Sequence, residues 1–244
     1  MSTSAGSSGE TSGSGIVIAV DGPSASGKSS ASRGTARALG LRYLDTGAMY
    51  RALTWWMLAR GVPVDDAEAV AREVAGPVIE VGTDPDEPWV TVDGRDVSAA
   101  IRTREVSGSV SAVARVPQVR ARLIAQQREI IARAREETPG IVTEGRDIGT
   151  VVAPDAVVKI FLTASETARA RRRTTDLAGD PGVTVSVTQA EQARRDAMDA
   201  TQMVEALDAV EIDSTLFSLD EVIEMIVGLA IRRAKLPDTA RTAR

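Results

Sequence analysis

The sequence contains no cysteine and no histidine. These absences exclude disulfide bonds, thiolate and imidazole zinc sites, and every catalytic dyad or triad that depends on Cys or His. Any chemistry must therefore use carboxylates, guanidinium groups, amines, hydroxyls and a hard metal ion. A chain without cysteine is compatible with a reducing compartment, and we expect a cytoplasmic protein.

Lysine is scarce as well, and long apolar runs are missing. The only lysines are Lys28, Lys159 and Lys235, so binding an anion at several points falls to arginine. Arginine suits that task because its planar fork binds two phosphate oxygens at once. No segment approaches the roughly 18 consecutive apolar residues of a transmembrane helix, and no charged-then-apolar signal segment opens the chain. We therefore expect no membrane partner.

The overall charge argues against a nucleic-acid partner. The net charge is −5, the isoelectric point is near 5.0, and the basic residues are spread along predicted helices. A negatively charged protein with scattered cations repels a polyanion, so we expect a small-molecule ligand instead. The 244 residues suit one α/β domain with an insertion, and we expect a monomer.

A phosphate-binding motif lies near the N-terminus. The apolar run 16–20 ends in Asp21 and continues into Gly-Pro-Ser-Ala-Ser-Gly-Lys-Ser at 22–29, which fits the pattern GxxxxGKS/T. Its glycines let the backbone direct successive N–H groups at phosphate oxygens, beside the positive N-terminal end of the next helix. Lys28 would reach the β- and γ-phosphates, and the Ser29 hydroxyl would bind Mg²⁺. The residues expected to bind the nucleotide phosphates are Gly22, Pro23, Ser24, Ala25, Ser26, Gly27, Lys28, Ser29 and Ser30.

The alternative interpretation of the motif is a Ser/Gly turn that joins two core elements. Its context favours nucleotide binding, because the motif follows a Val/Ile-rich run and precedes a helix-like segment, 31–39, that Gly40 closes.

The rest of the chain alternates between strand-like and helix-like segments. Strands are expected at 16–20, 41–45, 140–145, 157–162 and 210–213; helices are expected at 49–60, 65–75, 103–137 with a break near 116–117, after 165, at 186–203 and after 218. This order predicts an α/β fold, a three-layer doubly wound parallel sheet of five strands that binds ligands at the carboxyl ends of its strands.

The predicted core spans 16–75 and 140–235. Between them, residues 76–139 form an insertion whose first part, 78–97, alternates and turns like a small antiparallel sheet. The Ser/Gly-rich leader, 1–15, and the tail, 236–244, are expected to be disordered.

Arginines follow several predicted strand ends, namely Arg51, Arg146 and the cluster 169–173. The sequence has no Asn-Lys-x-Asp run of the guanine-reading type and no aliphatic strand ending in Asp-Glu, as a motor ATPase would have. Simpler interpretations stay open: the cluster 169–173 as a solvated helix face, Asp45 and Asp147 as helix caps, Asp196 and Asp199 as partners in helix-surface ion pairs, and Trp55 and Trp56 as core packing.

Several longer motifs carry a family resemblance. They are Ile-Ala-Val-Asp-Gly-Pro-Ser at 18–24, Leu-Asp-Thr-Gly-Ala-Met-Tyr-Arg at 44–51, Ile-Arg-Thr-Arg-Glu-Val-Ser at 101–107, Val-Pro-Gln-Val-Arg at 116–120, and Glu-Gly-Arg-Asp-Ile-Gly-Thr-Val-Val at 144–152. From residue 16 to about residue 234 the chain resembles the bacterial cytidylate kinases, which are nucleoside-monophosphate kinases with a phosphate-binding loop. The resemblance implies that ATP, with Mg²⁺, phosphorylates CMP and dCMP in pyrimidine nucleotide metabolism.

The resemblance also implies roles for individual residues. Ser111, Arg120 and Asp147 would recognise the cytosine; Arg51 and Arg146 would hold the acceptor phosphate; Arg195 with Asp199 would hold the ribose. A lid at about 169–185 would close over the donor phosphates, with Arg172 as its contact. The predicted catalytic residues are Lys28, Arg146 and Arg195, and the predicted substrate-binding residues are Thr46, Arg51, Ser111, Arg120, Arg146, Asp147, Arg195 and Asp199.

The chain departs from the family pattern at one place. Three residues after Asp199 the family has a second arginine, whereas this chain has Gln202 and then a shortened segment before Asp208. Losing one charge-assisted contact costs on the order of 1.5–3 kcal/mol. Three alternatives therefore stay open: a weakly active or inactive nucleotide-binding protein, a kinase of another nucleoside monophosphate, and a switch or ATPase that hydrolyses ATP without an acceptor.

Overall fold

The computed structural model describes residues 15–176 and 184–234 of the chain. Most of the expected leader, the expected tail and residues 177–183 of the expected lid lie outside these ranges. None of the helices in the described ranges has the length and hydropathy that would let it cross a membrane.

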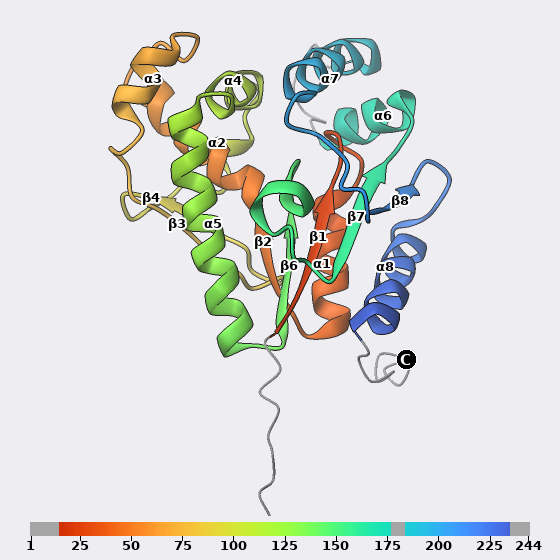
Figure 1. Cartoon of the computed structure of the whole chain (residues 1–244). Coiled ribbons are helices and arrows are strands. Elements are labelled where there is room, and N and C mark those ends of the chain that lie inside the picture. The colour runs from red at the N-terminus through yellow and green to blue at the C-terminus, as the bar shows by residue number, and fades with distance from the viewer. Residues whose placement is uncertain (1–14, 177–183, 235–244) are drawn as a thin grey trace, which may run out of the picture.

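A five-stranded parallel sheet forms the centre of the molecule (Figure 1). Its order is β2-β6-β1-β7-β8, with bounds β1 (Ile16–Asp21), β2 (Arg42–Asp45), β6 (Gly140–Glu144), β7 (Val158–Thr163) and β8 (Val210–Asp213). All four neighbouring pairs run parallel. The expected α/β fold with five parallel strands is confirmed, and the carboxyl ends of all five strands meet at one edge.

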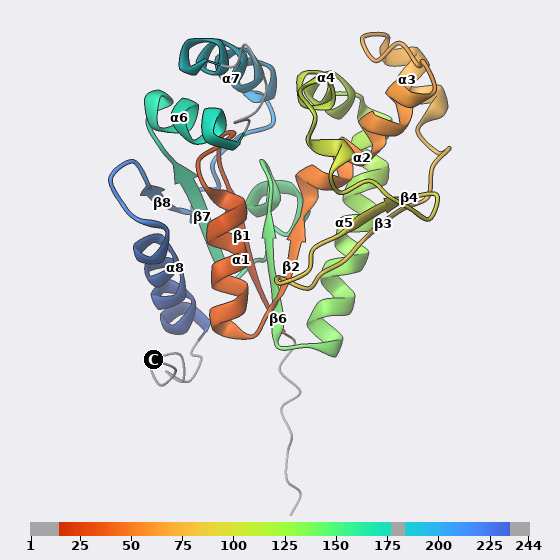
Figure 2. The same ribbon diagram turned by 180° about the vertical axis from the view of Figure 1, so that it is seen from behind.

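Helices cover both faces of the sheet (Figures 1 and 2). The helices are α1 (Lys28–Leu39), α2 (Thr46–Ala59), α3 (Ala67–Glu73), α4 (Arg104–Ala114), α5 (Pro117–Glu137), α6 (Glu166–Asp176), α7 (Val185–Asp199) and α8 (Leu219–Ala234), with a 3-10 turn η1 (Ala100–Arg102) and a π turn η2 (Ile148–Val152). Alternate residues of β1 explain the layering, since Val17 and Ala19 face a core shared with α2 and α5, while Ile18 and Val20 face a core shared with α1 and α8.

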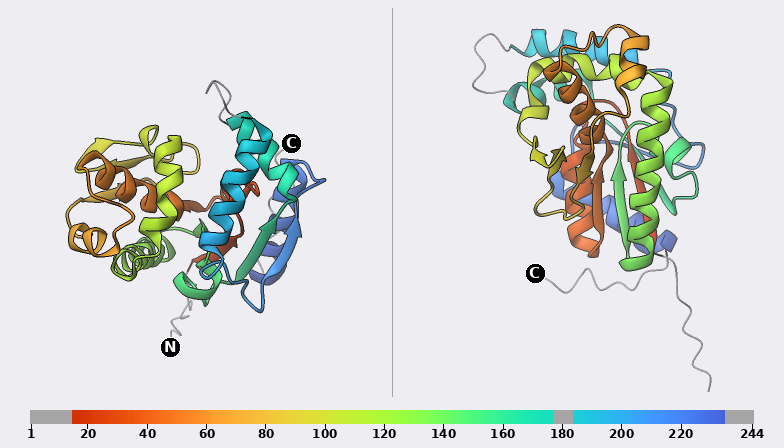
Figure 3. Two further views of the ribbon diagram at one scale, coloured as in Figure 1. Left: turned by 90° about the horizontal axis from the view of Figure 1, so that it is seen from above. Right: turned by 90° about the vertical axis from the view of Figure 1, so that its left-hand side faces the viewer.

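The chain between β2 and β6 forms one continuous group of elements, of which α2 and α5 pack on the sheet. It contains α2 to α5 and the predicted small antiparallel sheet, here β3 (Ile79–Val81), β4 (Val90–Val92) and β5 (Arg95–Asp96). Seen from above the strand ends, α6 and α7 lie side by side and face the group of α2 to α4 across the end of β1 (Figure 3). These two groups therefore flank the edge where the strands end.

One expected helix boundary needs correction, and one short element was not expected. Helix α7 ends at Asp199 rather than near Met203, and the amides of Gln202 and Met203 both donate to the Asp199 carbonyl in a turn that follows it. The π turn η2 after β6 has no periodic pattern in the sequence and was not expected. The expected core role of the tryptophans is confirmed, since Trp56 is buried and Trp55 packs against the same cluster.

Truncating a core side chain of α2 tests this packing. Leu53 is fully buried in the core shared with α5, so we expect Leu53→Ala to lower the free energy of unfolding by about 2–5 kcal/mol. Leu207→Ala is the matched control, since Leu207 is fully exposed and its truncation should change stability by less than about 0.5 kcal/mol. Urea unfolding followed by tryptophan fluorescence measures both, and equal losses in the two variants would contradict the assigned core.

Candidate active site

The phosphate-binding loop leaves the end of β1 and enters α1. Gly22 has φ of 143°, and a Cβ there would lie 2.1 Å from the Leu162 carbonyl oxygen of β7. Gly27 is the N-cap of α1 with φ of 97°. Both positions therefore need glycine, and the loop wraps around the N-terminal end of a 12-residue helix, where anions are stabilised.

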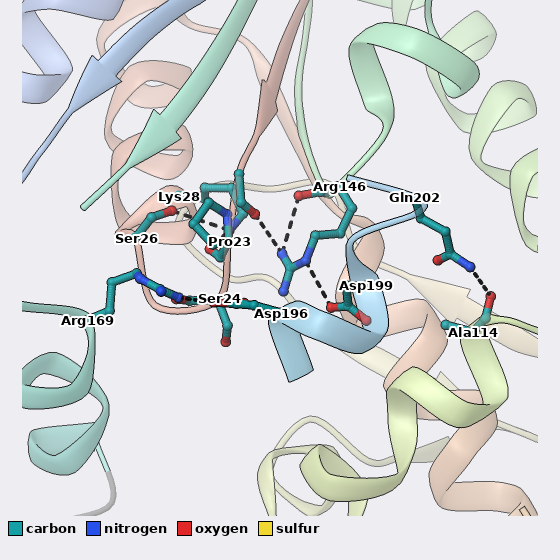
Figure 4. Close-up of polar contacts among 12 residues, drawn as sticks. Pro23, Ser24, Ser26, Lys28, Ala114, Arg146, Arg169, Asp196, Asp199 and Gln202 are labelled. Carbon is teal, nitrogen blue, oxygen red and sulfur yellow. Dashed lines mark hydrogen bonds and ion pairs between the residues drawn. The ribbon is translucent and has the colours of Figure 1, made fainter. Parts of the chain in front are cut away.

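Lys28 is the first residue of α1, and its side chain is buried inside the loop. Its Nζ donates to the Pro23 carbonyl oxygen at 2.6 Å and lies 3.5 Å from Ser26 Oγ (Figure 4). Burial, with a smaller effect of the nearby Arg146, lowers the pKa of Lys28 to about 7. Keeping the buried amine protonated therefore costs free energy, and a bound anion would stabilise the ammonium form.

The next residue, Ser29, lies beside buried oxygen ligands. It lines the cleft together with Glu144, the last residue of β6, and the Tyr43 hydroxyl of β2 donates to Glu144. Burial, and then the nearby Asp45, raises the pKa of Glu144. A hydroxyl with one or two carboxylates fits Mg²⁺, which takes few protein ligands and completes its shell with water and phosphate oxygens. No group of three or more acidic side chains gathers for a metal within the described ranges.

Two of the arginines in α6 reach the loop, so this cluster is not a solvated face. Arg169 is buried and donates to the Ser24 carbonyl oxygen and to Asp196 of α7. Arg172 donates to the Ser26 carbonyl oxygen at 3.1 Å. Arg173 donates instead to Ser107 of α4 across the strand ends, while Arg171 is exposed.

The other half of the site is built from arginine–carboxylate pairs. Arg120 of α5 donates to Asp147, which follows β6. Arg51 of α2 pairs with Asp45 at 3.0 Å. Arg146 donates to Asp199 Oδ2 at 3.3 Å and to the Gly22 carbonyl oxygen at 3.0 Å, so it joins α7 to the loop (Figure 4).

These pairs decide the alternatives left open for three aspartates. Asp45 is a helix cap, since its Oδ1 accepts the Ala48 amide at 2.8 Å, and it also lines the site. The side chain of Asp147 caps no helix. Asp199 pairs with a residue 53 positions away rather than with a neighbour on its own helix.

Four buried polar atoms in the same half have no hydrogen-bond partner among the described residues. They are Ser111 Oγ, Tyr50 Oη, Arg51 Nε and Arg195 Nε. Burial, and then the nearby Arg146, lowers the pKa of Arg195 to about 10, although Asp199 opposes this. Leaving such groups unpaired costs about 1–3 kcal/mol each, so the site is suited to a ligand that pairs them.

One cleft of about 380 Å³ joins the two halves. Its lining includes every predicted site residue except Gly22, Pro23 and Ser26, which form the inner side of the loop. The lining also contains residues that were not predicted as site residues: Asp45, Gly47, Tyr50, Arg102, Ser107, Val110, Ala114, Glu144, Gly145, Arg173 and Gln202. For Glu144, the sequence did offer one indication of a site residue, since it is an acidic residue at the end of a predicted strand.

Gln202 occupies the departure from the family pattern. Its Oε1 accepts from Arg120 and its Nε2 donates to the Ala114 carbonyl oxygen, each at 3.4 Å. Gln202 therefore bridges the end of α7 to α4 and α5 without adding positive charge. Arg102 and Arg173 line the same cleft, so cations other than the missing one are present.

Comparisons with known proteins agree on one family. The family model described as "Cytidylate kinase" matches residues 18–232. A cytidylate kinase of Streptomyces griseus subsp. griseus is 52% identical over 224 residues, which cover 90% of this chain and 94% of the relative. That of Streptomyces coelicolor is 52% identical over 218 residues (88% and 92%), and that of Mycobacterium avium is 45% identical over 227 residues (91% and 97%).

Similarity to solved structures is weaker. A gluconokinase from Sinorhizobium meliloti 1021 aligns with a TM-score of 0.47 and 17% identity, covering 91% of this chain and 95% of that one. A similarity at this level says nothing about the substrate of this chain.

The lowered pKa of Lys28 predicts proton uptake when a phosphate ligand binds. At pH 8 the amine, with a pKa of about 7, is mostly neutral, and an anion beside it favours the ammonium form and raises the pKa. Binding of MgATP at pH 8 should then take up as much as about one proton, and affinity should rise as the pH falls from 9 to 7. Calorimetry in buffers of different ionisation enthalpy measures the uptake. Lys28→Arg, which stays charged, is the control, and equal uptake by both proteins would contradict the prediction.

Proposed function

Because the chain belongs to the cytidylate kinase family, we propose that it transfers a phosphoryl group from ATP to CMP and dCMP, giving ADP with CDP or dCDP. The observation that carries the proposal is the single cleft that joins the phosphate-binding loop to a second half with buried, unpaired donors. A hydrolase needs only the first half. A kinase needs both, because it must hold an acceptor in line with the donor.

The donor half would bind the ATP phosphates. The loop amides and the N-terminal end of α1 would hold the β-phosphate, and Lys28 would span the β- and γ-phosphates. Arg172, already in contact with the loop, would add charge on the lid side. Ser29, with Glu144 close by, would hold Mg²⁺, which supplies positive charge to the phosphate oxygens when bound.

The acceptor half would hold the nucleoside monophosphate. Arg51 and Arg146 line the cleft and would bind its phosphate, and Arg195 with Asp199 would hold the ribose. The attacking phosphate oxygen is already anionic near neutral pH, so no strong general base is required, which suits a chain without histidine. Catalysis would then consist of alignment and of neutralising charge on the transferred group.

Base recognition would fall to Asp147, Arg120 and Ser111. The cytosine amino group can donate to the Asp147 carboxylate, whereas uracil would present a carbonyl oxygen to it. Arg120 holds that carboxylate, and the unpaired Ser111 hydroxyl lines the same part of the cleft. We also propose that the enzyme acts as a cytoplasmic monomer without nucleic-acid partners.

Removing the loop lysine tests the donor half. We expect Lys28→Ala to lower turnover by at least about 100-fold, because the variant loses a fixed positive charge at the transferred group. The variant should keep the wild-type urea midpoint or exceed it, since the lost amine is buried at a desolvation cost. Arg171→Ala, an exposed arginine of α6 outside the cleft, should keep near-normal turnover. Normal turnover in Lys28→Ala would refute the assignment.

An acceptor panel separates the proposed function from its alternatives. ADP formation is measured with ATP alone and then with CMP, dCMP, UMP or AMP added singly. We expect ADP only with an acceptor, and most with CMP and dCMP. ADP formed equally with ATP alone would indicate a hydrolase, no ADP despite stabilisation by MgATP would indicate an inactive binding protein, and a maximum with AMP or UMP would indicate another monophosphate kinase.

A further inference from the structure

The segment 145–149, which carries two of the proposed acceptor-binding residues, is attached to the strand that leads into the donor loop. The Gly145 amide donates to the Val20 carbonyl oxygen at 3.0 Å, and Arg146 donates to the Gly22 carbonyl oxygen. The residue between these two attachment points on β1 is Asp21. Its side chain has no role in the function proposed above.

Asp21 makes the tightest contacts of this attachment. It is the last residue of β1 and is 5% exposed. Its Oδ1 accepts the Ile148 amide and its Oδ2 accepts the Gly149 amide, both at 2.8 Å. Each carboxylate oxygen thus holds one amide of the first turn of η2, directly after Asp147.

There is little space for a side chain at Gly149, whose amide Asp21 accepts. A Cβ at Gly149 would lie 3.4 Å from Asp21 Oδ2 and 3.2 Å from Lys159 Cδ. Asp147 has φ of −143° and ψ of 28°, and its side chain takes no part in holding η2. The position of the Asp147 backbone therefore depends on the amides that follow it, which Asp21 holds, while Arg120 holds the Asp147 carboxylate.

We propose that Asp21 is a positioning residue that sets the acceptor-binding segment 145–149 relative to the donor loop. This inference rests on the proposed function. Asp21 does not line the cleft. It is the last residue of β1, and the phosphate-binding loop begins at the next residue, Gly22. The carboxylate would thereby fix the distance between the bound acceptor and the bound donor.

The two amides are accepted by different oxygens of Asp21, Oδ1 and Oδ2, so this arrangement needs a carboxylate. An asparagine offers one oxygen, so its amide group would face one of the two backbone N–H groups as donor against donor. The charged groups that face Asp21 are Asp147 from the segment after β6 and Lys28 from α1, while the amine of Lys159 from β7 is paired with Asp208. Burial raises the pKa of Asp21 to about 6, despite the two amides that lower it.

Steady-state kinetics of Asp21→Asn test the proposal. We expect the KM for CMP to rise about 5- to 100-fold, the size expected for an unpaired buried amide, while the KM for ATP changes less than about 3-fold. Asp66→Asn is the control for the loss of a carboxylate away from the cleft: Asp66 accepts two backbone amides at the start of α3, both on Oδ1, so an asparagine there keeps both bonds. It should change neither constant.

The pH profile gives a readout that a merely structural role would not move. The ratio of kcat/KM for CMP, wild type over Asp21→Asn, should be largest above pH 6 and fall towards one below it, because the wild-type carboxyl then protonates and loses an acceptor. The second ionisation of the CMP phosphate, also near pH 6, cancels in this ratio. Equal effects on the two KM values, or a ratio independent of pH, would overturn the proposal.

A second variant covers the case in which Asp21→Asn does not fold. Gly149→Ala crowds the same contact from the acceptor side, and we expect the same selective rise in the KM for CMP. An unchanged KM for CMP in a folded Gly149→Ala would count against the proposal. A wild-type enzyme that forms no ADP in response to CMP would instead refute the proposed function, so the two failures are distinguishable.

Discussion

The parallel pairing of β1 with β6 is the interaction on which the site depends. Val20 lies in register with Glu144, so the donor loop and the acceptor segment leave the sheet at the same level from adjacent strands. Parallel strands with this register bring residues more than a hundred positions apart into one buried edge. This register brings together four charged residues, namely Asp21, Lys28, Glu144 and Arg146. The first three have shifted pKa values, and Arg146 donates to the Gly22 carbonyl oxygen on the neighbouring segment.

The positive charges of the arginines at this edge of the sheet are balanced by carboxylates of the protein. The cleft and its border contain four arginine–carboxylate pairs, formed by Arg51, Arg120, Arg146 and Arg169 with Asp45, Asp147, Asp199 and Asp196. Asp45 ends β2, and Asp196 and Asp199 lie in α7. Helix α7 therefore neutralises Arg146 as well as Arg169. Buried like charges would otherwise repel strongly at this distance, and the fold would lose stability.

Much of the fold and the site was predictable from the sequence. The five strands follow apolar runs, the loop follows its glycine spacing, and α8 begins where a helix was expected after residue 218, with reciprocal bonds between Ser218 and Glu221 at its start. The pairing of the arginines was not predictable, because Arg120 and Asp147 are 27 positions apart and Arg146 and Asp199 are 53 apart. Such contacts depend on tertiary register, and the π turn η2 depends on a side chain from another strand, Asp21.

The paired arginines also determine which anions can compete for the cleft. An incoming phosphate group must displace or share a carboxylate at each guanidinium, so a single contact gains little free energy over the pair already present. Inorganic phosphate engages only one part of the cleft and must compete with these carboxylates there. In the proposed function, a nucleotide would engage the phosphate, ribose and base positions together. The aspartates that pair with these arginines would therefore make the cleft selective against the small anions of the cell.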